Sequence, residues 1–133
     1  MAVYDWSLYL NFSSNILGSS GFDEETVARV ATSRAYYAAF HAAEDYLLDS
    51  GVEMGYRAGS HETLCRCFKE MKYGTKKFQV SCCHIGNLLL SLKKQRRNAD
   101  YYNNVPFNKK IANKNCVQAQ EIINKIRELE SIS

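Results

Sequence analysis

The sequence contains almost no proline and no long hydrophobic run. Pro106 is the single proline, which favours helix, because proline inside a helix breaks it. No apolar run approaches the roughly 20 residues of a membrane-spanning helix. The opening MAVYDWSLYL lacks the basic region and small-residue cleavage site of a secretory signal. We therefore expect a helical, cytoplasmic protein with no membrane segment.

The five cysteines are odd in number, and their C-x-C and C-C spacings do not suggest the disulfide framework of a secreted protein. A mixed Cys/His zinc site could be drawn from His61, Cys65, Cys67 and the adjacent Cys82, Cys83 and His84. Their spacing matches no paired C-x-x-C pattern, and small buried cysteines are common in helical cores. There is also no Gly-rich phosphate loop, H-E-x-x-H or nucleophile elbow. We expect reduced thiols, no metal and no cofactor.

The charge is unevenly distributed along the chain. The net charge is +3, but residues 1–65 carry 3 basic and 9 acidic side chains, whereas residues 66–114 carry 12 basic and 2 acidic ones. A basic block suits contact with phosphate backbones, and a basic block beside an acidic one also suits pairing between copies of the chain. A solvated helix face explains the same charges equally well.

The hydrophobic periodicity predicts a single all-α domain over 1–133, an antiparallel up-and-down bundle of about five helices. The predicted helices span 3–17, 24–50, 61–72, 76–99 and 108–130, with Ser60 as a cap for the third and loops at 51–60 and 100–106. The second helix is apolar almost all round between Ala35 and Leu48, which is typical of a central helix.

Three side chains on the second helix, Arg34, Tyr37 and His41, share one stripe because they are three and four residues apart. They could line a phosphate or nucleotide pocket. The alternative is a set of internal hydrogen bonds, with Arg34 paired to a carboxylate. His61, at the start of the third helix, is either a further pocket residue or a capping contact.

The stretch KKQRRNADYY at 93–102 is the most chemically suggestive. Arg96 and Arg97 could simply interact with the dipole at the end of a helix. Arginine is also the best side chain for gripping phosphate in a bidentate manner, and Tyr101 and Tyr102 could stack on bases. Physical reasoning alone leaves both interpretations open.

Three separated segments together resemble one family. SRAYYAAFHAAEDYLLDSG at 33–51, GSH at 59–61 and RRNADYY at 96–102 are similar to the HEPN family, the higher eukaryotes and prokaryotes nucleotide-binding domain. They are closest to its small stand-alone prokaryotic branch, over about residues 24–130. The resemblance implies a HEPN-like helical bundle that forms a homodimer. It also implies a nucleotidyltransferase or other defence protein as partner, in a toxin-antitoxin or antiviral system.

In many HEPN proteins, an R-x(4–6)-H motif on the fourth long helix forms a metal-independent ribonuclease site. Counting onward from Arg96 reaches Tyr101, Tyr102 and Asn103, so the motif histidine is absent. A tyrosine with a pKa of about 10 is a poor general base at neutral pH. The standard mechanism would therefore need an imidazole from elsewhere, such as His41 or His61.

Three hypotheses follow. The first is a HEPN-like subunit that binds nucleotide or RNA, with Arg96 as the phosphate contact, Asp100 as its partner or a cap, and Tyr101 as a stacking group. The second is a ribonuclease toxin with an altered site, whose catalytic candidates are Arg96, Asp100 and Tyr101. The third is a scaffold subunit that docks an acidic protein surface. The candidate nucleotide- or RNA-binding residues are Arg34, Tyr37, His41, His61, Arg96, Arg97 and Tyr102.

Overall fold

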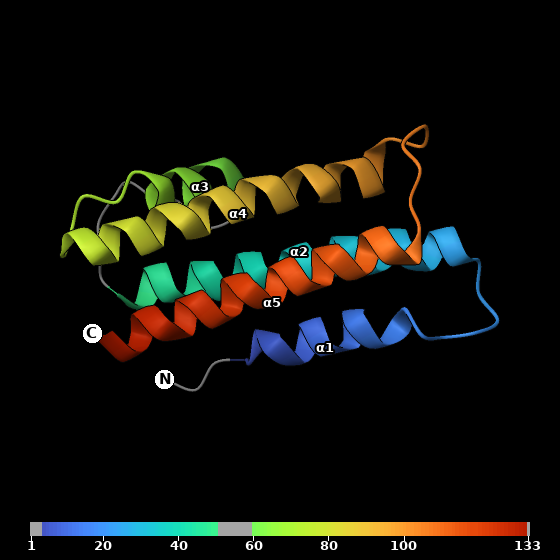
Figure 1. Cartoon of the computed structure of the whole chain (residues 1–133), viewed down its shortest axis with the longest axis horizontal. Coiled ribbons are helices and arrows are strands. Elements are labelled where there is room, and N and C mark those ends of the chain that lie inside the picture. Colours follow the sequence, from blue (N-terminus) through green and yellow to red (C-terminus); the bar gives the residue numbers. More distant parts are fainter. Residues whose placement is uncertain (1–3, 51–59, 133) are drawn as a thin grey trace.

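Five α-helices make up the bundle in the computed structural model, which describes residues 4–50 and 60–132. They are α1 (Trp6–Ile16), α2 (Glu24–Asp49), α3 (His61–Lys69), α4 (Lys76–Tyr101) and α5 (Lys109–Ile132). The helices α1, α2, α4 and α5 run alternately in opposite directions, and the short α3 lies beside α4 (Figure 1). No strand occurs in the described ranges. The predicted all-helical, antiparallel bundle is confirmed.

Local capping sets where the helices begin. Asp5, Asp23 and Thr75 each accept a hydrogen bond from a backbone N–H in the first turn of α1, α2 and α4, which satisfies groups that have no partner within the helix. Ser60 occupies the corresponding position before α3, but its hydroxyl donates to Thr63 Oγ1 at 2.8 Å and makes no backbone cap. Ser60 is therefore the N-cap residue of α3, as predicted, but it does not make the side-chain hydrogen bond to the backbone that usually accompanies this position.

Several helix ends differ from the prediction by one to three residues. The third helix ends at Lys69, before residue 72, and the fourth continues through Asp100 and Tyr101, which the sequence places in a loop. Contacts from α2 hold this last turn of α4, because Ser33 Oγ donates to Asp100 Oδ2 at 2.9 Å. Residues 51–59 of the loop predicted at 51–60, and the predicted helix start at Val3, lie outside the described residues.

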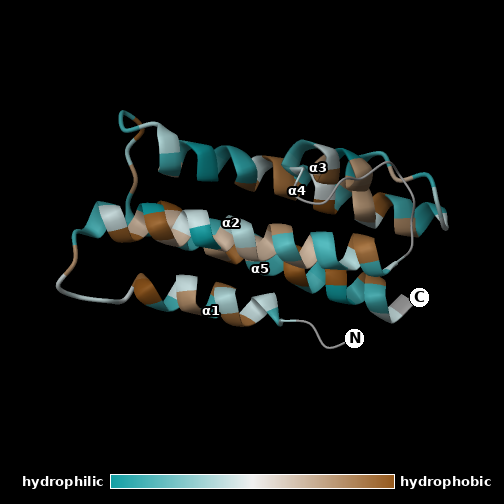
Figure 2. Ribbon diagram, turned by 180° about the vertical axis from the view of Figure 1, so that it is seen from behind, coloured by the Kyte–Doolittle hydropathy of each residue, from teal (hydrophilic) through white to brown (hydrophobic). Residues whose placement is uncertain are grey.

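The helix α2 is the centre of the bundle and contacts all four others. All of its alanines except the partly buried Ala42 are fully buried, and so are Tyr36 and Phe40, apart from 2% of the Phe40 surface. Small residues allow neighbouring helices to approach closely, while the aromatic rings fill the remaining volume. Hydrophobic and hydrophilic residues alternate along most helices, whereas the last turns of α4 are largely hydrophilic (Figure 2). The predicted central helix is confirmed.

A glycine allows α3 to pack tightly on α4. A Cβ atom at Gly86 would lie 2.8 Å from the backbone nitrogen of Lys69 and 3.0 Å from the carbonyl oxygen of Cys65. Real Cβ atoms do not approach a backbone so closely, because interiors are already close-packed. The backbone of α3 therefore occupies the space that any other side chain at this position would need.

Candidate functional site

Arg96 is a buried cation surrounded by phenol rings. Only 7% of its surface is exposed. Its guanidinium carbon lies 5.4 Å from the ring centre of Tyr36 and 5.6 Å from those of Tyr37 and Tyr101. We call these three rings the phenol cage. The faces of aromatic rings attract cations, so two residues of α2 and one of α4 hold this charge inside the protein.

The polar partners of Arg96 are distant. Its Nη1 atom lies 3.8 Å from Asp100 Oδ2 and 3.4 Å from the hydroxyl oxygen of Tyr101. Its Nε atom is buried and has no hydrogen-bond partner among the described residues. A buried polar group without a partner loses its hydration and gains nothing in return. The guanidinium thus retains hydrogen-bonding capacity that residues 4–50 and 60–132 do not use.

His61 lies against the same rings. Its Nδ1 atom shares a hydrogen bond of 2.7 Å with the Tyr36 hydroxyl, and its ring stacks on Phe40 with centres 4.2 Å apart. Burial lowers the pKa of His61, and the positive charges of Arg96 and Lys93 lower it further. The fold therefore packs an imidazole from α3 and the arginine of α4 against the same two rings of α2, Tyr36 and Tyr37, and His61 is a packed side chain rather than a cap.

The predicted stripe of Arg34, Tyr37 and His41 forms and connects to the phenol cage. The Arg34 guanidinium carbon lies 4.9 Å from the ring centre of Tyr37, whose ring is 6.2 Å from that of His41. Arg34 donates to the Tyr9 hydroxyl at 3.0 Å and to Ser33 Oγ at 3.2 Å. One of the two interpretations paired Arg34 with a carboxylate, but the observed partners are hydroxyls. Arg34 therefore lacks close charge compensation from the described residues.

His41 contacts the single tryptophan of the chain. The rings of Trp6 and His41 stack with centres 4.2 Å apart, and His41 Nδ1 lies 3.7 Å from Glu44 Oε1. Trp6 Nε1 donates to Asp45 at 3.1 Å. These contacts tie α1 to α2, and they give His41 a structural role in addition to its place on the stripe.

Arg29 fixes the end of α4 on which the site depends. Its guanidinium donates to four backbone carbonyl oxygens, those of Asn98, Ala99, Tyr102 and Val105. The last carbonyls of a helix have no partner within the helix, and a cation there also favours the helix dipole. Arg29 therefore holds the turn that carries Asp100 and Tyr101.

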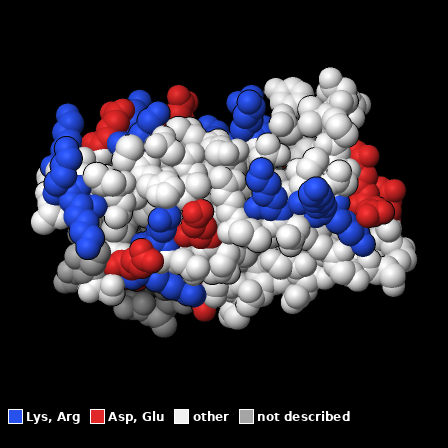
Figure 3. All heavy atoms as spheres, in the orientation of Figure 1, with Lys and Arg blue, Asp and Glu red and all other residues white. Residues whose placement is uncertain are grey.

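Arg97 and Tyr102 lie away from the phenol cage. They line a shallow hollow of about 360 Å³ along α4, together with Leu90, Lys93, Lys94 and Asn98. On the face shown in Figure 3, Lys and Arg side chains are interspersed with Asp and Glu side chains and do not form one continuous basic patch. The basic character of the sequence is thus concentrated in short local groups on this face.

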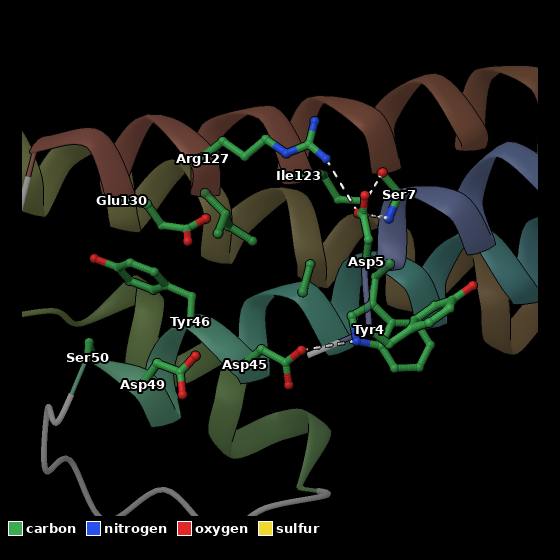
Figure 4. A pocket seen from close by; sticks show the side chains of 13 residues that line it. Tyr4, Asp5, Ser7, Asp45, Tyr46, Asp49, Ser50, Ile123, Arg127 and Glu130 are labelled. Atoms are coloured by element: carbon green, nitrogen blue, oxygen red, sulfur yellow. Dashed lines mark hydrogen bonds and ion pairs between the residues drawn. The ribbon is translucent and has the colours of Figure 1, made fainter. Parts of the chain in front are cut away.

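A larger hollow of about 720 Å³ lies elsewhere, where α1 begins and α2 and α5 end (Figure 4). Its charged lining is mostly acidic, with Arg127 beside Asp5 at 3.5 Å. The other carboxylates are Asp45, Asp49 and Glu130. Burial raises the pKa of Asp45. An acidic lining repels phosphate, so this hollow does not suit a nucleotide.

The sequence did not single out Tyr36, Ser33 or Arg29. Ser33 and Tyr36 precede Arg34 and Tyr37 in the segment at 33–51. Because this helix is apolar on all sides, its sequence does not indicate which tyrosine faces Arg96. Arg29 contacts residues about 70 positions further along the chain, and no local pattern predicts such a contact.

No family model matches this chain, and no curated protein matches it. Among the described residues, no helix is both long and apolar enough to cross a membrane. The same residues contain no group of three or more His, Cys, Asp or Glu side chains arranged to hold a metal ion.

Proposed function

We propose that this chain is a HEPN-like helical subunit that binds nucleotide or RNA through a phosphate contact at Arg96. The observation that carries the proposal is the buried guanidinium with an unused Nε donor. An incompletely compensated buried charge costs several kcal/mol. A phosphate oxygen would supply the missing acceptor and the opposing charge, in the geometry that a guanidinium fork favours.

Exposed aromatic rings and further cations near Arg96 support the same proposal. Tyr101 is 69% exposed and Tyr102 is 45% exposed, so both could stack on bases, which is how many proteins bind single strands. Lys93 and Arg97 lie one turn of α4 before and beside Arg96. They would add phosphate contacts that are independent of sequence.

The test is binding of labelled RNA and of ATP over a range of salt concentrations. Arg96→Met should abolish most of the binding and reduce the slope of log affinity against log salt by about one per lost phosphate contact. Arg66→Ala, which removes an exposed arginine on α3, is the matched control and should bind as the original protein does. Unchanged binding by Arg96→Met would refute the phosphate contact.

A second candidate function is metal-independent ribonuclease activity. It is favoured by the position of His61, since an imidazole and a guanidinium next to the same rings are the groups that such chemistry needs. Incubation with structured and single-stranded RNA in EDTA tests it. Cleavage by the original protein that is lost in both Arg96→Met and His61→Gln would support ribonuclease activity. If the RNA stays intact, only the proposed binding function remains.

The proposed partners are a second copy of the chain and a nucleotidyltransferase or other defence protein, as the resemblance implies. Sedimentation velocity of the purified chain tests the homodimer, and the neighbouring gene is the cheapest test of the partner. If neither RNA nor ATP binds at physiological salt while an acidic protein co-purifies, the scaffold hypothesis replaces the binding one.

A further inference from the structure

Arg96 and His61 border the same two aromatic rings from different helices. The guanidinium carbon of Arg96 is 5.4 Å from the ring centre of Tyr36 and 5.6 Å from that of Tyr37. The imidazole centre of His61 is 5.5 Å and 5.8 Å from the same two ring centres. One permanent cation and one group that can become a cation therefore stand around one pair of phenols.

The charges that face His61 keep it neutral in the absence of a ligand. Burial lowers its pKa most, and Arg96, Lys93 and His41 lower it further, while Glu44 acts in the opposite direction. An anion bound at Arg96 would cancel part of the repulsion from the cations. The pKa of His61 would then rise, so binding and protonation would be linked.

The burial of Arg96 limits which phosphate can reach it. With 7% of its surface exposed, it offers little surface to a ligand, so a ligand with a small end reaches it more easily than a bulky one. A phosphodiester within a strand carries a nucleoside on both sides, and both nucleosides would have to fit close to Arg96. A terminal phosphate has one substituent, and it carries up to two negative charges, since its second pKa is about 6. Two charges match Arg96 together with a protonated His61.

We propose that the Arg96 site takes a phosphomonoester, the terminal phosphate of an RNA or of a mononucleotide, and that His61 takes up a proton as the phosphate binds. This rests on the proposed function, because it assumes that Arg96 is a phosphate contact. It adds the class of phosphate, and it makes His61 the second group that contacts the ligand.

The experiment is calorimetric titration of the full chain with one short RNA in three forms, carrying a 5′-phosphate, a 3′-phosphate or hydroxyls at both ends. Each titration is repeated near pH 7 in buffers with different ionisation enthalpies, which reports the protons taken up. At least one phosphorylated form should bind about tenfold more tightly than the hydroxyl form, which is about 1.4 kcal/mol. Its binding should take up a proton, at most about one per site.

His61→Gln is the diagnostic variant, because glutamine can still form a hydrogen bond with Tyr36 but cannot become charged. It should lose both the proton uptake and the preference for a phosphorylated end. Arg97→Ala should weaken all three forms by the same factor. Should His61→Gln not fold, competition by inorganic phosphate provides the test in the original protein, since it should displace only the phosphorylated RNA.

Equal affinity for all three RNAs, or the same proton uptake in His61→Gln, would overturn the terminal-phosphate site. If the three forms bind equally and Arg96→Met still abolishes binding, the proposed function survives and only the class of phosphate is wrong. If no RNA or nucleotide binds, the proposed function fails as well.

Discussion

Arg96 Nη1 lies 3.8 Å from Asp100 Oδ2, which is beyond hydrogen-bonding distance. The same carboxylate oxygen accepts a hydrogen bond of 2.9 Å from Ser33, so Ser33 holds Asp100 at this distance. The guanidinium is consequently stabilised by ring faces more than by an ion pair. Because the buried guanidinium has no close counter-charge, it contributes little to the stability of the fold. For the same reason it could accept an incoming anion.

We expect Arg96→Met to stabilise the protein. Methionine fills most of the same volume and removes a buried charge that lacks full compensation. Replacing a whole buried ion pair by apolar groups is neutral or raises the free energy of unfolding by about 1–4 kcal/mol, whereas leaving one charge buried lowers it. The Asp100 side chain is 30% exposed and keeps its hydrogen bond from Ser33, so we expect the first outcome. Urea unfolding followed by circular dichroism measures it. Arg97→Met, on the exposed side of α4, is the control and should change stability little. A marked loss of stability in Arg96→Met would show that the phenol cage fully compensates the charge.

Arg29→Lys should loosen the end of α4. Lysine keeps the charge but cannot donate to four carbonyl oxygens at once, so we expect a loss of about 2–4 kcal/mol. Hydrogen exchange of the amides at 98–102 should accelerate. Glu25→Gln removes the half-exposed ion-pair partner of Arg29 and should cost less than about 1 kcal/mol. If both variants cost the same, the ion pair rather than the carbonyl contacts holds this turn.

Gly86→Ala should destabilise the protein even though alanine favours helix. The gain in helix propensity is about 1 kcal/mol, but the new methyl group would meet the α3 backbone at 2.8 Å. Overpacking of this kind costs about 1–3 kcal/mol. Thermal unfolding measures the net effect, with the exposed Asn87→Ala as the control for helix propensity. An increased melting temperature in Gly86→Ala would mean that α3 shifts without cost.

Asp45→Asn should stabilise the protein near neutral pH. Burial raises the pKa of Asp45 although Trp6 donates a hydrogen bond to it. A carboxyl group whose pKa is raised by folding stabilises the folded protein when the pH is below its pKa in the unfolded chain, about 4. This stabilisation is lost as the pH rises through the pKa in the folded protein. Asparagine keeps an acceptor for Trp6 without the charge, so we expect a gain of up to about 1 kcal/mol at pH 7.

The advantage of Asp45→Asn over the original protein should shrink as the pH falls to about 4. The fluorescence of Trp6, the single tryptophan, reports unfolding in both proteins. Comparing the two at each pH cancels the opposite contribution of Asp5 and Asp23, whose pKa values are lowered by hydrogen bonds. An advantage that is the same at both pH values would contradict the raised pKa of Asp45.

The five thiols should differ in reactivity. Burial raises the pKa of Cys65 and of Cys82 to about 11 and also raises those of Cys67 and Cys116. Since the thiolate is the reactive form, these four should react with a disulfide reagent only after unfolding. Cys83 is partly exposed and should react first. Mass spectrometry of the native protein should show one fast label, and Cys83→Ser should remove it.

Much of the bundle could be predicted from local patterns. The three- and four-residue spacing of apolar side chains predicted all five helices, because one face of each must be buried. The apolar surface of the second helix predicted its central position. The last turn of α4 was missed, because Arg29 and Ser33 hold it across the bundle and nothing in NADYYNN itself marks the helix as continuing.

The sequence by itself determined the helices, their order and the presence of an arginine pair at the end of α4. Helical periodicity is a local property, so each segment carries its own information. Only the tertiary structure decided that Arg96 faces inward and Arg97 outward, that Tyr36 joins the phenol cage, and that His61 lies beside them. Which side chains meet depends on how three helices are packed, and residues 36, 61 and 96 are too far apart in sequence for any local pattern to encode their contact.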